Sequence, residues 1–323
     1  MRTCSVRETV RLQFLTQRAA IDAENIGRAA LEMDMPPEGG VFVFEISSFQ
    51  LDLCPTFRPD ISVHLNFSPD HIDRHGTIEN YAASKLKIFG GPGDAIVGVD
   101  DRESEKIMEQ VQQAGERRIY PVSGRKELKA GVSVIDDTLS DTINPDQALS
   151  LPFKVKTLPG SHNHQNAAAA YAVARLLGLD NEDILEALQT YPGLPHRQYL
   201  IAVINGIAYV NDSKATNAIA TAFALASYRK IYWIAGGRPK DGGLSGTEPF
   251  LKNVKHAFLI GDAMDDFGSW LEKHGVARSL SGTLDRAVQD AHAMAQGERG
   301  QRRHEQPGLH GAQSRELDGS PPT

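Results

Sequence analysis

The chain has 323 residues, and its 41 Asp plus Glu against 34 Lys plus Arg give a formal net charge of −7. This acidic balance argues against a mainly electrostatic grip on nucleic acid or on an anionic membrane. No apolar run approaches the roughly 20 residues of a membrane span, and two distant cysteines, Cys4 and Cys54, fit a reducing compartment. We therefore expect a cytoplasmic protein of two domains, with no nucleic-acid partner and no membrane insertion.

The first part of the chain alternates strand and helix patterns. Residues 40–46 are apolar at successive positions, which is typical of a parallel strand covered on both faces. The patterns predict strands over 40–46, 60–67 and 94–100. They predict helices over 78–89, 166–179 and 181–191, the last with Asn181 as N-cap.

A break rich in Pro and Gly at 191–197 predicts a boundary, after which the alternation restarts. Asn205-Gly206 is a strong hairpin signal inside 199–212. The patterns predict further strands over 230–237 and 256–262, and helices over 218–228 and 282–296. The fold class is therefore α/β, with mostly parallel sheets and flanking helices.

Both ends depart from this pattern. Residues 1–22 carry no strand pattern and no clear helix start. Residues 297–323 lack apolar periodicity and are rich in polar residues, Gly and Pro, so we expect a disordered tail.

Two polar stretches follow the first predicted strands, at the edge where open α/β sheets bind ligands. Glu45 ends the first strand and is suited to hold Mg²⁺, although it could equally be a solvated strand-end carboxylate. The loop 66–76 holds Asp70, His71, Asp73 and His75, which suggests a metal site or a charged loop with a helix cap.

Lys85 shares a helix face with Tyr81 and Ala82, so we expect its amine to be partly buried. A desolvated lysine has a lowered pKa and can react as the free amine. The alternative is a lysine whose stem is covered while its charge reaches water.

A third stretch runs into the Ala-rich helix and clusters His162, Asn163, His164 and Asn166 at the helix entry. The two asparagines could cap the helix or contact an adenine edge. Arg197, in the predicted linker, is suited to a phosphate. Loop 235–243 combines glycines with two cations and is a plausible anion-binding loop.

The stretch YVNDSKATN (209–217) places Asp212, Ser213, Lys214 and Thr216 after a predicted strand. Such a turn is either solvated or built for a polar ligand. No G-x-x-x-x-G-K-[ST] phosphate loop occurs in the 323 residues.

Seven segments together resemble the Mur ligase family in content and order. They are ENIGRAAL, FEISSFQLD, NFSPDHIDRHG, AASKLKIF, LPGSHNHQNAAAA, GLPHR and NDSKATN. The pattern is most similar to the branch that adds D-glutamate to UDP-N-acetylmuramoyl-L-alanine, and the resemblance covers about 23–296. GLPHR and NDSKATN favour this branch over folylpolyglutamate synthase, which shares the chemistry.

The resemblance implies a central ATPase domain over 23–192 and a Rossmann-like C-terminal domain over 193–296. It implies ATP and Mg²⁺ as cofactors, UDP-N-acetylmuramoyl-L-alanine and D-glutamate as substrates, and a monomeric enzyme of peptidoglycan precursor synthesis. In the family a substrate carboxylate attacks the γ-phosphate of ATP, and the amine of the incoming amino acid then attacks the resulting acyl phosphate.

The resemblance also assigns roles to particular residues. Glu45, His71 and a carbamylated Lys85 would form the metal site. Asn163 and Asn166 would lie beside adenine, Arg197 beside the phosphates or ribose, and Asp212 at the ribose hydroxyls. Asn25 would contact the UDP-muramoyl substrate. Lys214, Thr216 and Lys240 would approach D-glutamate or the acyl phosphate; Lys85, His71, Lys214 and Lys240 are thus the catalytic candidates.

The departures from the family define a further expectation. The UDP-binding domain and the glycine-rich phosphate loop are not found, and residues 1–22 and 297–323 match no family segment. We therefore expect a fragment of such a ligase, with a truncated or frameshifted reading frame and little activity on its own. The alternatives are a ligase like folylpolyglutamate synthase and an inactive nucleotide-binding remnant.

Overall fold

A computed structural model describes residues 20–23, 34, 38–67, 72–155, 157–238 and 242–304. The chain divides into two compact units. The first comprises Met1–Ala202 with Ala208–Lys214, and the second comprises Val203–Ile207 with Ala215–Thr323.

The first unit is built on a six-stranded sheet and a separate parallel pair. The pair is β1 (Ala20–Ala23) and β2 (Val41–Phe44), with Ala20 opposite Val41. The sheet has the order β3 (Ile61–His64), β4 (Gly93–Gly98), β5 (Arg117–Ser123), β6 (Val132–Ile135), β7 (Thr138–Asp141) and β8 (Leu149–Pro152). Strands β3 to β6 run parallel, and β6 to β8 pair antiparallel.

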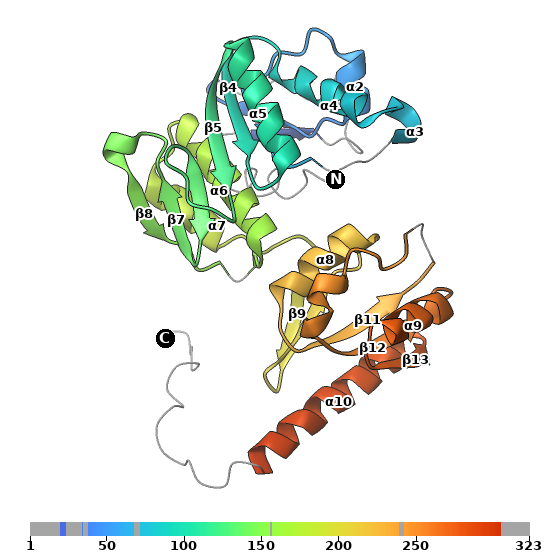
Figure 1. Cartoon of the computed structure of the whole chain (residues 1–323). Coiled ribbons are helices and arrows are strands. Elements are labelled where there is room, and N and C mark those ends of the chain that lie inside the picture. Colours follow the sequence, from blue (N-terminus) through green and yellow to red (C-terminus); the bar gives the residue numbers. More distant parts are fainter. Residues whose placement is uncertain are drawn as a thin grey trace, which may run out of the picture. The chain divides into compact units, whose positions relative to one another are not determined.

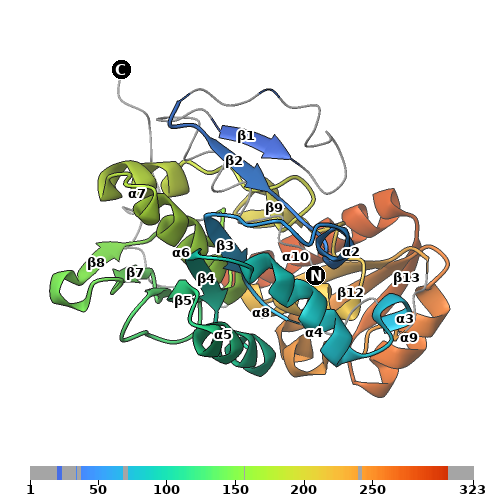
Figure 2. The same ribbon diagram turned by 90° about the horizontal axis from the view of Figure 1, so that it is seen from above.

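Helices cover both faces of this sheet (Figures 1 and 2). They are α2 (Ser48–Leu53), α3 (Ile72–His75), α4 (Ile78–Leu86), α5 (Arg102–Ala114), α6 (Ser161–Leu176) and α7 (Asn181–Gln189), with short 3-10 turns at Lys87–Phe89 and Pro145–Gln147. Strand β4 shows why both faces need cover: Ala95 and Val97 pack with Ile107 of α5, and Ile96 packs with the α6 side. All three strand residues are fully buried, as expected for a parallel strand between two layers of helices.

Helix α6 is the central element of one layer. Its Ala167–Ala170 run and Tyr171 are fully buried, because small side chains let the helix lie close to the sheet. Gly124 shows how close: a Cβ there would lie 1.9 Å from the carbonyl oxygen of Ser161. The start of α6 is therefore fixed against the end of β5.

The predicted N-cap of α7 is wrong. Asp180 occupies that position, without a side-chain capping bond. The Asn181 side chain is instead used in the core, with its Oδ1 2.7 Å from the hydroxyl of Tyr171.

The second unit has a three-stranded parallel sheet in the order β11 (Ile231–Gly236), β12 (Val254–Ile260), β13 (Arg278–Gly282). Its helices are α8 (Ala218–Ser227), α9 (Met264–Lys273) and α10 (Leu284–His304), with a 3-10 turn at Glu248–Asn253. Buried Ala257, Leu259 and Leu271 lie in its core.

The predicted hairpin is confirmed. Strands β9 (Tyr199–Ile204) and β10 (Ile207–Asn211) pair with each other. Asn205 and Gly206 both have positive φ, 51° and 69°, which is the conformation that a two-residue hairpin turn requires.

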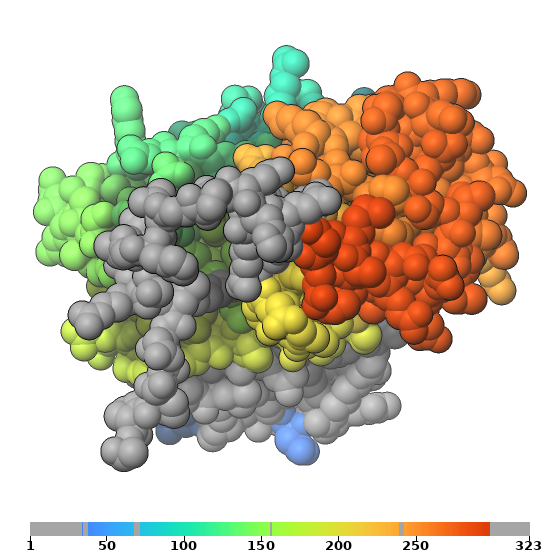
Figure 3. Space-filling view, turned by 90° about the horizontal axis from the view of Figure 1, so that it is seen from below, coloured from blue at the N-terminus to red at the C-terminus, as the bar shows by residue number. Residues whose placement is uncertain are grey.

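Two predictions about the chain ends are corrected. The last helix does not end at Gln296, because α10 continues to His304. The coloured part of this helix appears as the red patch in Figure 3. Residues 1–22 are not free of strand, because β1 begins at Ala20 and gains its partner from β2, which no local pattern reveals. The tail beyond residue 304 lies outside the described residues. Within the described ranges, no helix combines the length and apolarity needed to cross a membrane.

Candidate functional site

Glu45 is half-buried and follows β2 directly. The residues after it are explained by a capping box at the start of α2. The Gln50 backbone N–H donates to the Ser47 hydroxyl, and the Ser47 backbone N–H donates to Gln50 Oε1 at 2.9 Å. Ser47 and Gln50 therefore fix the connection that carries Glu45, and need no ligand to account for them.

Lys85 lies on the helix face that the sequence predicts. It is half-buried in α4, and its Nζ is 5.1 Å from the centroid of the buried Tyr81 ring. His64 is buried nearby, and burial, followed by the positive charge of Lys85, lowers its pKa to about 3. His64 is therefore neutral at physiological pH, next to the Lys85 amine.

The loop 66–76 is only partly described. Asp70 and His71 lie outside the described residues, and Asp73 is exposed. His75 makes hydrogen bonds within the fold to Ser48 and Ser84. Across the described ranges no group of three or more His, Cys, Asp or Glu could hold a metal ion. Helix α2, which follows Glu45, does pack on α4, which carries Lys85.

The two asparagines at the start of α6 lie together. Asn163 Nδ2 donates to the Pro159 carbonyl at 2.8 Å, and Asn166 Nδ2 donates to Asn163 Oδ1 at 3.3 Å. The N-cap is Gly160, which makes no side-chain capping bond. The capping alternative is therefore wrong for both asparagines.

The same end of α6 is joined to the linker. His162 Nε2 lies 3.2 Å from Gln198 Nε2, and the Gln198 backbone N–H donates to Asp212 Oδ1 at 3.0 Å. Burial, aided by the charges of His164 and Arg125, lowers the pKa of His162 to about 4. His162, Gln198 and Asp212 thus connect the α6 entry to the end of β10.

Asp212 is a half-buried carboxyl group beside Arg197. Burial raises its pKa to about 6, and the Gln198 N–H and the Arg197 charge only partly offset that rise. A carboxyl group whose pKa is raised by burial is a candidate for a binding site.

The turn after β10 is organised by His196. Its Nδ1 lies 3.0 Å from Asn211 Nδ2 and 3.2 Å from Ser213 Oγ, and its carbonyl accepts the Lys214 N–H at 3.0 Å. Sequence reasoning missed this role, and the residue's left-handed φ of 65° is visible only in the structure. The Lys214 side chain is exposed.

Thr216 is also exposed and belongs to the second unit, next to Asn217, which caps α8 through Ala220 N–H at 2.8 Å. Asn25 and Lys240, like His71, lie outside the described residues. Their assigned roles stay predictions.

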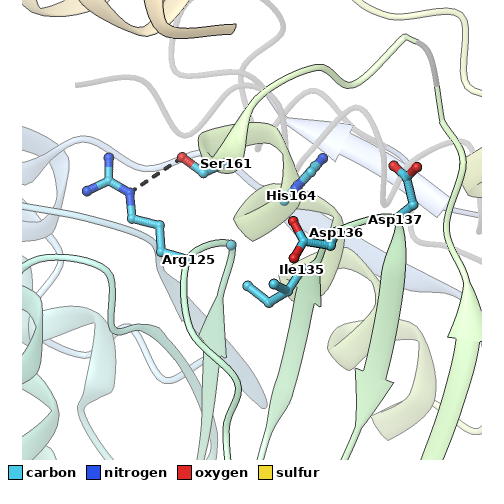
Figure 4. Close-up of a pocket in the computed structure, with 7 residues that line it drawn as sticks. Arg125, Ile135, Asp136, Asp137, Ser161 and His164 are labelled. Atoms are coloured by element: carbon cyan, nitrogen blue, oxygen red, sulfur yellow. Dashed lines mark hydrogen bonds between the residues drawn. The ribbon is translucent and has the colours of Figure 1, made fainter.

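A shallow cavity of about 600 Å³ lies on another side of the α6 entry (Figure 4). Its lining combines the loop after β5, the β6–β7 turn and α6: Gly124, Arg125, Ile135, Asp136, Asp137, Ser161 and His164. Ser161 and His164 share one face of α6, three residues apart, whereas Asn163 and Asn166 share a different one. Arg125 Nε is 3.4 Å from Ser161 Oγ.

Sequence reasoning did not single out Arg125, Asp136 or Asp137. The two aspartates form the β6–β7 turn with positive φ, 43° and 61°, and an Asp-Asp pair between short strands is a weak turn signal. Burial lowers the pKa of His164, against the opposing effect of Asp137 and Asp136.

The fold and the site define an α/β protein with polar groups gathered at the helix entry and strand ends of a largely parallel sheet. The family model described as "Mur ligase middle domain" matches residues 9–174, just over half of the chain. The chain belongs to the Mur ligase family.

Curated relatives agree. The chain is 43% identical over 272 residues to a UDP-N-acetylmuramoylalanine–D-glutamate ligase of Rhizobium meliloti, and 44% identical over 275 residues to that of Phenylobacterium zucineum. Each alignment covers 84% of this chain and 58% of the relative. The chain thus spans less than two thirds of the length of these relatives.

Solved structures show the same fold. MurF from Acinetobacter baumannii matches with a TM-score of 0.63 at 17% identity, over 92% of this chain and 69% of that one. The ligase MurC from Thermotoga maritima matches with a TM-score of 0.63 at 14% identity, over 93% and 74%. MurF from Thermotoga maritima, solved in complex with ADP, matches with a TM-score of 0.58 at 13% identity, over 92% and 78%.

The family resemblance is therefore confirmed, with one correction. The family match begins at residue 9, so the prediction that residues 1–22 match no family segment is wrong from residue 9 onward.

Proposed function

We propose that this chain carries out, in the cytoplasm, the part of an ATP-dependent ligase that joins D-glutamate to UDP-N-acetylmuramoyl-L-alanine for peptidoglycan synthesis. The relatives at 43–44% identity are UDP-N-acetylmuramoylalanine–D-glutamate ligases, which supports this substrate pair. The structural observation that carries the proposal is the connection of Asn163 and Asn166 on α6, through the adjacent His162 and then Gln198, to Asp212.

This connection suits a nucleoside. Asn163 and Asn166 would contact the adenine edge, Asp212 would accept the ribose hydroxyls, and Arg197 would reach a phosphate. Among the described residues, Gln198 Oε1 and Gln165 Nε2 are buried without a hydrogen-bond partner. A buried polar atom left unpaired costs about 1–3 kcal/mol, so a bound ligand that supplies a partner would remove part of that cost.

The metal assignment is tested by the chemistry of its donors. Glu45 fits Mg²⁺, because it offers a half-buried carboxylate at a strand end. Lys85 fits only as a carbamate, because its ammonium form would repel the ion and a carbamate supplies oxygen donors. His71 would complete the set. Bound there, Mg²⁺ would neutralise charge on the transferring phosphoryl group.

Lys214 and Lys240 are the cations proposed to act near the acyl phosphate. The Lys214 backbone is anchored on His196 while its side chain is exposed, so its ammonium group can stabilise the charge that develops when the amine attacks the acyl phosphate. Thr216 and Lys240 would bind the incoming D-glutamate.

Nucleotide binding to the purified chain tests the proposal. We expect ADP to stabilise the protein in a thermal-shift titration, and Asn166→Ala to weaken ADP binding roughly tenfold through loss of its base contact. Asp137→Asn, on the other flank of α6, is the matched control and should bind ADP normally.

Failure of the wild-type chain to bind ADP would contradict the proposal and favour an inactive remnant. Binding of a pteroyl substrate in place of the UDP-sugar would favour a folylpolyglutamate synthase.

A further inference from the structure

Five side chains of the first unit, from α2, α3, α4 and the 3-10 turn that follows α4, form one continuous set of hydrogen bonds. Ser48 Oγ lies 3.0 Å from His75 Nε2, and His75 Nδ1 lies 3.5 Å from Ser84 Oγ. Ser84 in turn donates to Asp52 Oδ1 at 2.6 Å. Lys87 Nζ reaches the same Asp52 oxygen at 2.6 Å, which closes the set with a cation.

The carboxylate gives this chain of bonds a direction. Hydrogen bonds from Lys87 and Ser84 lower the pKa of Asp52, so it is ionised at neutral pH and only accepts. The Ser84 hydroxyl proton is therefore committed to Asp52, and the Ser84 oxygen is left to accept from His75 Nδ1–H. In the neutral form of the ring this arrangement leaves Nε2 as the acceptor, which faces the Ser48 hydroxyl.

Aromatic contacts fix the imidazole ring as well. It stacks on Phe49 at 5.5 Å with an interplanar angle of 13°, and it lies 5.1 Å from the Tyr81 ring. Tyr81 is the ring over which Lys85 Nζ lies. His75 thus contacts α2 through Ser48 and Phe49, and α4 through Ser84 and Tyr81.

Two members of this set lie close in sequence to the two described members of the proposed metal site. Ser48 begins the helix that follows Glu45, and Ser84 immediately precedes Lys85. We infer that His75 is a positioning residue that holds the connection bearing Glu45 against the helix bearing Lys85. The inference rests on the proposed function for the roles of Glu45 and Lys85, whereas the hydrogen-bond set stands on its own contacts.

The tautomer of His75 gives a direct test. Long-range ¹H–¹⁵N correlation spectra of the wild-type chain should show His75 protonated at Nδ1. Asp52→Ala removes the oxygen that accepts from Ser84 and should abolish that preference. A wild-type His75 protonated at Nε2, or an Nδ1–H form that survives Asp52→Ala, would overturn the inferred direction and with it the set.

Hydrogen exchange tests the mechanical role. His75→Phe keeps a stacking ring but removes both hydrogen bonds, so backbone amides in 45–53 and 78–86 should exchange roughly tenfold faster together. His274→Phe is the matched control: it also removes a hydrogen bond from a stacked histidine, here to the Trp270 carbonyl at 2.8 Å, but in the second unit. Faster exchange confined to 72–77 would overturn the positioning role.

Titration with Mn²⁺ alone separates this inference from the proposed function. We expect the wild-type chain to bind Mn²⁺ and His75→Phe to bind it several-fold more weakly, with His274→Phe unchanged. Equal binding by wild type and His75→Phe would overturn His75 as a positioning residue. No Mn²⁺ binding by the wild-type chain would contradict the metal site of the proposed function, while the tautomer and exchange data would still decide the hydrogen-bond set.

Discussion

Two polar clusters in the first unit differ in whether all of their buried polar groups have hydrogen-bond partners. The α2–α4 cluster consists of Ser48, Asp52, His75, Ser84 and Lys87, and each of these side chains hydrogen-bonds to another member. The α6–linker cluster consists of His162, Asn163, Asn166, Gln198 and Asp212. It holds a buried Gln198 oxygen without a partner among the described residues.

The ionisable groups of the α6–linker cluster have shifted pKa values. The pKa of Asp212 is raised to about 6 and that of His162 is lowered to about 4, in both cases mainly by burial. A cluster in which every polar group has a partner is suited to hold structure, whereas one that buries an unpaired oxygen and shifts the pKa values of its ionisable groups is suited to bind a ligand. Four predictions test this difference.

The largest effect is expected from Gly124→Ala. The new Cβ would lie 1.9 Å from the Ser161 carbonyl, so the start of α6 must move away from β5. We expect a loss of about 3 kcal/mol in the free energy of unfolding, measured by urea denaturation. Gly297→Ala, in open space near the end of α10, should be neutral or slightly stabilising.

Amide exchange of the Gly124→Ala variant tests whether the two clusters are independent. Amide exchange should rise in the α6 entry and the linker, while the α2–α4 cluster keeps its protection. Equal loss of protection in both clusters would show that they are not independent.

The second prediction concerns pH. Between pH 4 and 6 the folded state keeps a proton on Asp212 that the unfolded state has released, so its contribution to the free energy of unfolding falls as pH rises. His162 behaves oppositely: the unfolded state keeps its proton up to about pH 6.5, so its contribution rises with pH from about 4. The two contributions should largely cancel in the wild-type chain.

Single variants should expose each contribution. Asp212→Asn should leave a free energy of unfolding that rises with pH from 4 to 6.5, and His162→Gln should leave one that falls from 4 to 6. Each slope should be at most roughly 1.4 kcal/mol per pH unit, and smaller for the partly exposed Asp212. Urea titrations at half-unit pH steps measure these slopes; identical slopes in both variants would contradict the assignment.

A smaller effect is expected from Ser84→Ala. The variant removes a buried hydroxyl that donates to Asp52, and it should cost about 1 kcal/mol in the free energy of unfolding. Ser213→Ala, at an exposed serine, is the control and should change that free energy by less than about 0.5 kcal/mol. An equal cost at both sites would mean that the α2–α4 cluster adds nothing beyond an ordinary surface contact.

The smallest effect is expected from Lys87→Met. Its ammonium group pairs with Asp52 at 2.6 Å, but its side chain is 48% exposed. Removing such a pair should cost no more than about 0.5 kcal/mol, and the difference should shrink in 1 M salt. A cost that salt leaves unchanged would point to packing of the lysine stem instead.

The sequence predicts the strands and helices whose residue patterns are uniform. The apolar strand β4, the Ala-rich α6 and the Asn205-Gly206 turn were all predicted, because each pattern has one dominant local cause. Strands β6 to β8 are short and mixed in polarity, and they are stabilised by pairing with neighbours. No local pattern reports such pairing.

The candidate site also contains residues that local motifs predict and residues that they do not. Motifs located Glu45, Lys85, Asn163, Asn166 and Asp212. In the structure Asn163 and Asn166 bond to each other, and His162 beside them in sequence contacts Gln198, whose backbone N–H donates to Asp212. The roles of His75 and His196 were not predictable, because each depends on partners distant in the sequence. His75 reaches back to Ser48, and His196 reaches forward to Asn211 and Ser213.

The Asn205-Gly206 turn also bears on the order in which the site forms. Closing a hairpin takes on the order of microseconds, because its strands are adjacent in the chain. Parallel strands such as β3 and β4 must wait for a crossover to close, and long-range contacts slow folding. We therefore expect the end of β10, which carries Asp212, to acquire its local geometry early, and the α6 side of the same cluster to join it only after the sheet has assembled.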